Sequence, residues 1–285
     1  MTAPSRRQPD GIFARSYGVV LLFNERPLPD SAGLVEAVQR RLPGCELMRP
    51  AKDALAFVHP AHGVLCNDGA VPARTLILKT DDLLDPATLE QPLQQSWSWL
   101  EASNAVRDAR HMLLLSDLMS SGLPCKERLR LFQGVLAGVV DMLPCAGIHW
   151  REAGQIVSPG AFLAAVDEHG LQFPLPGAVN VRFYRIMGSD KADGGDIIMD
   201  TLGLGALGLV DIQCHFRGLD PGEVSRVLFA LALHIYDAGP RFENGDTVQG
   251  ITAAQKWTVN FEESIVAPKR PVLDLTLHAP HAAGR

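Results

Sequence analysis

The chain has 285 residues, of which 47% are hydrophobic and 20% are charged, so it can bury a sizeable core. Its formal net charge of -6 at pH 7 argues against binding to nucleic acid or to anionic membranes, because both require a basic surface. No apolar run is long enough to form a membrane-spanning helix, so we expect no membrane insertion.

The cysteines and the first residues indicate the compartment. Five cysteines occur without a C-x-x-C pair, and a chain of this size needs no disulfides, so we expect buried thiols in a reducing environment. Arg6 and Arg7 are not followed by a long apolar segment, so the start of the chain does not resemble a secretory signal. We therefore expect a cytoplasmic protein of bacterial origin.

The first half of the chain mixes strands and helices. A flexible lead is expected over residues 1–15, and the apolar run 17–23 predicts a central strand. Asp30 is placed to cap a helix that ends before Pro43-Gly44. The later elements that we predict are strands at 45–48, 54–59, 63–66 and 74–79, helical structure at 86–108, a strand at 111–118, a helix at 124–143, a strand at 145–150 and a helix at 158–170.

The second half is predicted to begin after a loop rich in proline and glycine at 173–177. A strand at 179–187 and a turn at 193–196 predict a hairpin that leads into the stretch 197–216. Asp220, Pro221 and Glu223 are typical of a helix start. The other predicted elements are the helix to 239 and short strands at 247–251, 257–261 and 272–277.

The order of these elements predicts the fold class. We expect an α+β protein with mixed, largely antiparallel sheets flanked by helices, because the second half lacks the regular alternation of a doubly wound fold. The predicted organisation is an N-terminal subdomain over 16–172 and a C-terminal subdomain over 178–278. The similar order of elements in the two halves is compatible with two similar, packed subdomains.

Motifs for common chemistries are missing or out of context. The sequence has no G-x-S-x-G, G-x-x-x-x-G-K-[ST] or H-E-x-x-H motif. Gly203, Gly205 and Gly208 match G-x-G-x-x-G, but a strand follows them where a dinucleotide site needs a helix. His59 and His62 have no nearby partners for a zinc site. We therefore predict no metal and no cofactor.

The most polar pattern lies in the stretch 197–216. Residues 210–216 alternate strictly, which predicts a strand with one buried face and one polar face. Asp200, Asp211 and His215 are the weak catalytic candidates, because a carboxylate beside an imidazole can make it a general base. The alternative is a solvent-facing strand beside a turn. The candidate binding residues are Thr201, Gln213, Asp246 and Trp257.

Several short segments of the sequence resemble those of one protein family. They are MDTLGLGALGLVDIQCHF, LDPGEV and ENGDTVQG, then Trp257 and ESIVAPKR, with QSWSWLEAS, RHMLLLSDL and LPCAGIHW upstream. Over 17–277 the chain is similar to a bacterial family known as domain of unknown function 4261 (DUF4261). The resemblance implies a cytosolic bacterial protein, and a link of such families to secretion systems or toxin and immunity genes. It implies no activity and no catalytic residues.

Three functional hypotheses follow. The first is a non-enzymatic protein-binding protein, such as an immunity protein, an adaptor or a secretion-system accessory. The second is a hydrolase-like enzyme that uses His215 with Asp211 or Asp200. The third is a homodimer formed through a sheet edge or through the small residues Gly134 and Gly138 of the predicted helix at 124–143.

Overall fold

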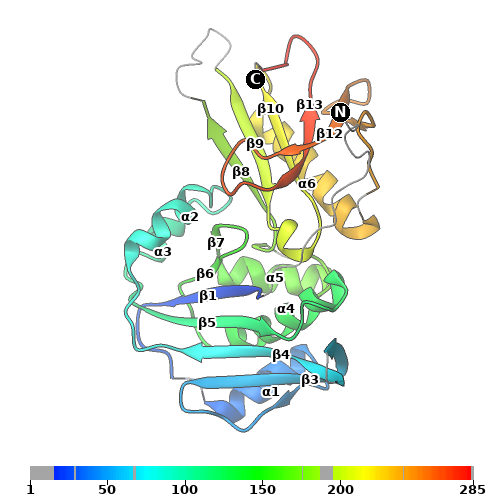
Figure 1. Cartoon of the computed structure of the whole chain (residues 1–285). Helices are drawn as coiled ribbons and strands as arrows, with labels where there is room; N and C mark the ends of the chain where they lie inside the picture. The colour runs from blue at the N-terminus through cyan, green and yellow to red at the C-terminus, as the bar shows by residue number, and fades with distance from the viewer. Residues whose placement is uncertain are drawn as a thin grey trace. The chain divides into compact units, whose positions relative to one another are not determined.

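The structure is a computed structural model that describes residues 16–28, 30–66, 69–174, 176–186, 195–239 and 241–283. The chain forms two compact units that divide between Ala178 and Val179 (Figure 1). We call them the N-terminal unit and the C-terminal unit. The predicted lead over 1–15 and residues 193–194 of the predicted turn lie outside the described residues.

The N-terminal unit is built on a seven-stranded sheet with the order β2-β3-β4-β5-β1-β6-β7. Every pair of neighbouring strands in it is antiparallel. The apolar run predicted as a central strand is β1, which pairs with β5 on one side and β6 on the other. The strands are β1 Gly18–Phe23, β2 Glu46–Leu47, β3 Ala54–Cys66, β4 Gly69–Lys79, β5 His111–Leu118, β6 Gly147–Trp150 and β7 Gln155–Val157.

Three helices lie on one face of this sheet: α1 Ser31–Arg41, α4 Cys125–Met142 and α5 Pro159–His169 (Figure 1). Helix α4 packs against α1, α5 and the strands β4 and β5. Its glycines allow the close approach to α1, since a Cβ added at Gly138 would lie 2.5 Å from the Val38 Cα. The small residues of α4 are therefore buried inside the unit.

The helical structure predicted over 86–108 is present but interrupted. The chain forms three short elements there, η1 Pro86–Leu89, α2 Glu90–Gln94 and α3 Ala102–Ala105. The Ser96 hydroxyl donates to the Pro92 carbonyl at 2.7 Å and accepts from the Ile156 amide at 2.7 Å. This contact with β7 fixes the chain where a helix would have continued. The segment packs around Leu22 and Ile156.

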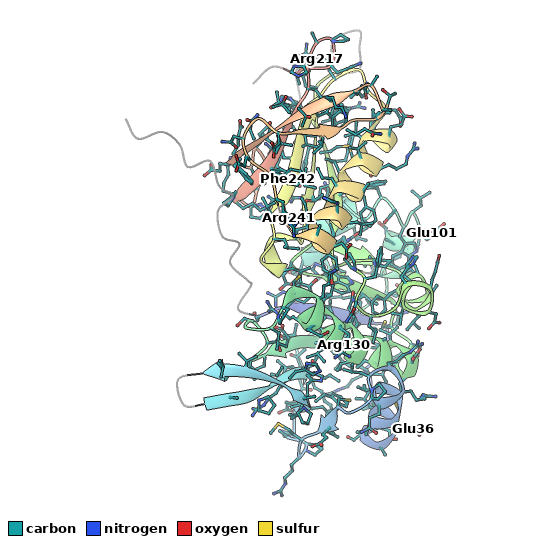
Figure 2. The ribbon with its side chains drawn as sticks, turned by 90° about the vertical axis from the view of Figure 1, so that its right-hand side faces the viewer. Glu36, Glu101, Arg130, Arg217, Arg241 and Phe242 are labelled. Carbon is teal, nitrogen blue, oxygen red and sulfur yellow. The ribbon has the colours of Figure 1, made fainter. Side chains whose placement is uncertain are left out.

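The strands predicted at 54–59 and 63–66 belong to one strand, β3, with an irregularity between His59 and Gly63. Strand β5 pairs with β4 only from Arg74 onward. Among the described residues, those of β4 before Arg74 and those of β3 after Val58 therefore pair only with each other, up to the turn of the hairpin. Figure 2 shows this part of the hairpin projecting as a two-stranded arm.

The C-terminal unit has a six-stranded sheet with the order β11-β12-β13-β10-β9-β8. Its strands β10 and β13 are parallel, and the other pairs are antiparallel. Helix α6, Pro221–Ala238, begins at the predicted cap Asp220 and packs against β8, β9 and β10. The strands are β8 Asn180–Arg185, β9 Ile197–Leu202, β10 Asp211–Phe216, β11 Thr247–Gln249, β12 Lys256–Glu263 and β13 Pro271–Thr276. The two units confirm the predicted α+β class with mostly antiparallel sheets.

The glycine-rich segment joins β9 to β10, which pair as antiparallel neighbours. It holds one short 3-10 turn, η2 Gly205–Leu207, and then enters β10 directly. Gly203 and Gly208 have φ of 129° and 77°, values that favour glycine. The segment is thus a connection, as predicted. Within the described residues no helix combines the length and apolarity needed to cross a membrane.

Candidate functional site

The polar face of β10 is buried, so the interpretation as a solvent-facing strand is wrong. Asp211 and Gln213 are 1% and 0% exposed, and Asp200 and Thr201 on β9 are both fully buried. Strand β9 pairs with β10 so that Asp200 lies opposite Gln213. Together with their partners these residues form the buried polar cluster, which consists of Arg182, Asp200, Thr201, Asp211, Gln213, Arg270 and Asp274.

Two guanidinium groups neutralise Asp200. Arg182, opposite Asp200 on β8, donates through Nε to Oδ1 at 2.9 Å and through Nη2 to Oδ2 at 2.5 Å. Arg270 donates through Nη2 to Oδ2 at 2.7 Å. Both oxygens of this buried carboxylate are therefore occupied by charged donors, which is the arrangement that makes a buried charge tolerable.

Arg270 also holds Asp211, with its Nε 3.0 Å from Oδ2. The Asp211 Oδ1 atom accepts from the Thr201 hydroxyl and from the Leu204 amide, each at 3.1 Å. Burial raises the pKa of Asp211, while the charge of Arg270 opposes that rise. The carboxylate fixes the start of the glycine-rich connection to β10.

The segment 264–270 closes the cluster. Gln213 donates to Asp274 Oδ1 at 2.9 Å and accepts from the Ile265 amide at 2.6 Å. Ser264, which is fully buried, donates to the Pro268 carbonyl at 3.0 Å. Hydrogen bonds and ion pairs thus connect β8, β9, β10 and β13 to one loop, and the buried polar cluster acts as a structural core.

The structure does not bring His215 to the carboxylates that were predicted with it. Its Nε2 atom lies 3.9 Å from Asp196 Oδ2. His215 and Asp211 share a face of β10, but four residues of extended strand separate their Cα atoms by about 13 Å. The neighbouring Cys214 is fully buried, and burial raises the pKa of its thiol well above the ordinary value.

The last two predicted binding residues lie elsewhere in the C-terminal unit. Asp246 is exposed, and its Oδ2 accepts from the Glu243 amide at 2.8 Å. Trp257 is 3% exposed, and a Cβ added at Gly250 would lie 2.6 Å from its Nε1. Asp246 thus shapes a turn, and Trp257 packs in the core beneath β11.

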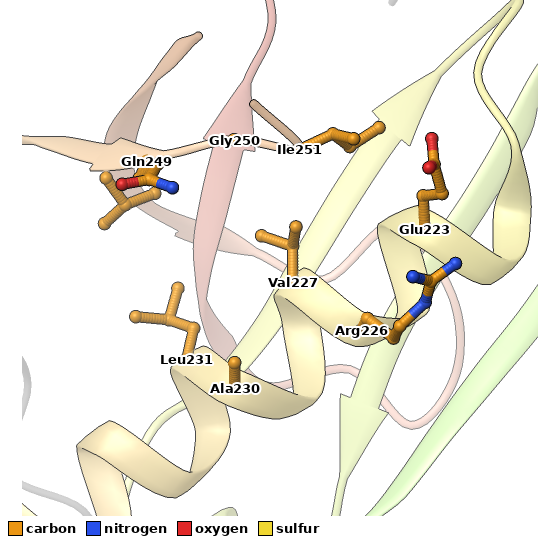
Figure 3. Close-up of a pocket in the computed structure, with 9 residues that line it drawn as sticks. Glu223, Arg226, Val227, Ala230, Leu231, Gln249, Gly250 and Ile251 are labelled. Carbon is orange, nitrogen blue, oxygen red and sulfur yellow. The ribbon is translucent and has the colours of Figure 1, made fainter. Parts of the chain in front are cut away.

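An open groove lies between α6 and the β11 segment (Figure 3). Its volume is about 400 Å³. Val227 and Leu231 point from α6 toward the strand segment, and Glu223 and Arg226 lie at one end. The other lining residues are Ala230, Val248, Gln249, Gly250 and Ile251. One feature of the sequence indicates this groove. Helix α6 carries apolar residues around most of its circumference, whereas a helix that buries a single stripe carries them on one side.

The β11 backbone adds hydrogen-bonding groups beside this groove. The Val259 amide donates to the Asp246 carbonyl at 2.8 Å, and the Gly250 amide donates to the Gln255 carbonyl at 3.0 Å. Alternate residues of an antiparallel strand face the same neighbour, so Thr247 and Gln249 direct their amides and carbonyls away from β12. No strand of the described residues pairs with this edge of β11.

The C-terminal unit is thus an α+β unit with a closed polar core and an open groove. Residues 200–276, from β9 to the end of β13, match the family described as Domain of unknown function (DUF4261). This match confirms the predicted resemblance for that part of the chain. No curated protein and no solved structure gave a significant match. Among the described residues no three His, Cys, Asp or Glu side chains are grouped as metal ligands.

Proposed function

We propose that the protein binds an extended segment of another protein in the groove between α6 and β11, and that it is not an enzyme. The observation that carries the proposal is the outward-facing edge of β11 next to the apolar side chains of Val227 and Leu231. An extended segment that adds to a sheet edge gains main-chain hydrogen bonds, and its alternate side chains enter the adjacent groove.

The lining gives the chemistry of this segment. We expect the side chains of this segment that enter the groove to be apolar, because Val227, Leu231 and Val248 are among the residues that line it. Glu223 and Arg226 carry opposite charges at one end, so the segment carries a charged or polar residue there. The preferred partner sequence therefore alternates apolar and polar residues and has a charged or polar residue at the end that lies beside Glu223 and Arg226.

The hydrolase alternative has less support. A general base must reach the proton that it removes, and Asp200 and Asp211 are 0% and 1% exposed and bound by arginines. His215 faces Asp196 instead of these two carboxylates.

The setting that we propose is the bacterial cytoplasm, with an immunity, adaptor or secretion-accessory role. The cysteines whose side chains are described, Cys45, Cys125, Cys145 and Cys214, are all free, which suits a reducing compartment. The net charge of -6 favours a protein over a nucleic acid as the partner.

The test is a display library of peptides of about ten residues, a length that exceeds the three residues of β11 and leaves ends to be sampled. We expect selection of alternating apolar and polar sequences. The variant Gln249→Pro removes one outward amide and should weaken the selected peptides by about tenfold or more.

Gln249→Ala is the matched control, because it keeps the backbone amide and should bind the same peptides nearly as well. Leu231→Asp places a charge among the apolar residues of the groove and should also weaken binding of the selected peptides by about tenfold or more. Equal affinity of Gln249→Pro and Gln249→Ala for the selected peptides, or selection of no common pattern, would refute strand addition at β11.

A further inference from the structure

The sheet of the N-terminal unit has one covered face and one face that is open along β3, β4 and β5. In β4, Ala73, Thr75 and Ile77 are buried, whereas Arg74, Leu76 and Leu78 between them are partly exposed. The helix packed on β4 and β5 is α4, and it lies with α1 behind the strands in Figure 1. The open strip consists of Val58, Arg74, Leu76, Leu78, Leu114 and Leu118.

Arg74 is the cation of this strip. Val58 lies opposite it on β3 and Leu118 opposite it on β5, so its immediate cross-strand neighbours are apolar. Its Nε atom is buried and has no hydrogen-bond partner among the described residues. A guanidinium held half-buried on an apolar surface favours a carboxylate, because that is the group that matches its charge and planar geometry.

The dimensions of the strip suit a helix. Strands β3 and β5 are two strand spacings apart, about 10 Å, which matches the diameter of an α-helix. On the β1 side of the strip the same face is already covered, because Val20 and Met112 pack against the cluster around Leu22. The two-stranded arm of the β3–β4 hairpin begins next to Arg74, on the side toward the hairpin turn, and it bounds one end of the open strip (Figure 2). One helix would complete the layer.

We propose that the open strip binds an amphipathic helix of a partner protein, with an Asp or Glu on or beside its apolar stripe that pairs with Arg74. Leu76, Leu78 and Leu114 receive the apolar stripe of this helix. The site is independent of the groove between α6 and β11, so the protein has two docking surfaces for two kinds of segment, one extended and one helical.

The test is a display library of helical peptides of about 14 residues, which cover roughly 20 Å. The peptides share a leucine stripe, and the positions that flank it are randomised. On the wild-type protein we expect enrichment of Asp or Glu at one flanking position. The charge-reversed variant Arg74→Glu should instead enrich Lys or Arg at that position, and it should bind the first set about tenfold or more weakly.

Arg40→Glu on α1, an exposed arginine of the same unit, is the matched control and should select the wild-type set. Arg74→Gln, which keeps the size without the charge, tests the assignment if Arg74→Glu does not fold, and it should enrich neither charge. The same flanking residue with wild-type and Arg74→Glu proteins, or no enriched residue with the wild type, would overturn the proposal. The groove variant Leu231→Asp should leave this selection unchanged, which separates failure at the two surfaces.

Discussion

Arg270 and Asp200 are joined by a hydrogen bond of 2.7 Å between Nη2 and Oδ2, although they are 70 residues apart in the chain. The same guanidinium reaches Asp211, so a single side chain from the loop before β13 balances two buried carboxylates on β9 and β10. The stability of the C-terminal unit therefore depends on this one arginine more than on any exposed ion pair.

Replacing Arg270 by Gln should lower the free energy of unfolding by about 3–5 kcal/mol at neutral pH, because it leaves buried charge without its partner. Arg270→Lys keeps the charge without the forked geometry and should cost less. Lys256→Ala, an exposed change on β12, should have an effect within about 0.5 kcal/mol. Urea unfolding measures all three, and equal losses for Arg270→Gln and Lys256→Ala would contradict the role of Arg270.

The loss caused by Arg270→Gln should also depend on pH. Burial raises the pKa of Asp211 and Arg270 opposes the rise, so removal of Arg270 raises the pKa of Asp211 further. A carboxyl group whose pKa is higher in the folded than in the unfolded state stabilises the fold at acid pH. This stabilisation is lost as the pH rises through the pKa of the folded state. The difference between the wild type and Arg270→Gln should therefore shrink as the pH falls, which urea unfolding across acid pH can measure.

Protonation of His59 should lower the free energy of unfolding as the pH falls below neutrality. Burial lowers its pKa to about 4, so its neutral form is favoured in the folded state and the unfolded chain takes up the proton first. Its stabilising contribution is complete above the unfolded value of 6.5 and is lost as the pH falls toward about 4. His59→Gln, which can still bond to the Thr75 hydroxyl, should flatten the pH profile by up to about 1.4 kcal/mol per pH unit.

His234→Gln on the exposed side of α6 is the control for this measurement and should keep the wild-type profile. His149 contributes in the same direction, because burial lowers its pKa to about 4 as well. The free energy of unfolding of His59→Gln should therefore still fall with decreasing pH, but less steeply than that of the wild type. An unchanged slope would mean that His59 is protonated equally in the folded and unfolded states.

Gly138→Ala should destabilise the N-terminal unit even though alanine favours a helix. The added Cβ would lie 2.5 Å from the Val38 Cα, so α1 and α4 must separate, at a cost of about 1–3 kcal/mol. Gly160→Ala in α5 is the matched control, because the nearest atom to its Cβ is 3.8 Å away. It should be neutral or stabilising by up to about 1 kcal/mol. Thermal unfolding distinguishes the two, and similar melting temperatures would argue against the α1–α4 contact.

Gly177→Ala should be the most damaging glycine substitution in this unit. Gly177 has φ of 108°, and a Cβ there would lie 1.9 Å from the Trp150 Nε1. Backbone strain and overlap together should cost about 3 kcal/mol or more and change the fluorescence of Trp150. Gly170→Ala has φ of 75° but no atom within 4 Å, so it should lose only about 1 kcal/mol.

The local patterns of the sequence predicted most strands and helices, because side-chain periodicity and capping residues act over short distances. The Asp220 cap and the alternation in β10 are examples. The break in the segment 86–108 was not predictable in this way, because it depends on the contact of Ser96 with Ile156, 60 residues later. The same limit explains the joining of 54–59 and 63–66 into β3, which the pairing with β4 determines.

The candidate site shows the same limit more sharply. Periodicity placed Asp211, Gln213 and His215 on one strand face but could not say what covers that face. The covering residues Arg182 and Arg270 come from β8 and from the loop before β13, and neither had a local signal as a partner. The outward edge of β11 depends on strand order, which a single sequence does not contain.

The position of β13 has a consequence for synthesis of the chain. It lies between β12 and β10 and follows both in the chain, so it joins the β11–β12 hairpin to the earlier strands β8, β9 and β10. Until β13 has left the ribosome, these two groups of strands have no shared neighbour and Arg270 has no fixed place. A nascent chain that stops before Pro271 therefore carries two exposed strand edges, one on β10 and one on β12, and the synthesis of β13 removes both of these sites for aggregation.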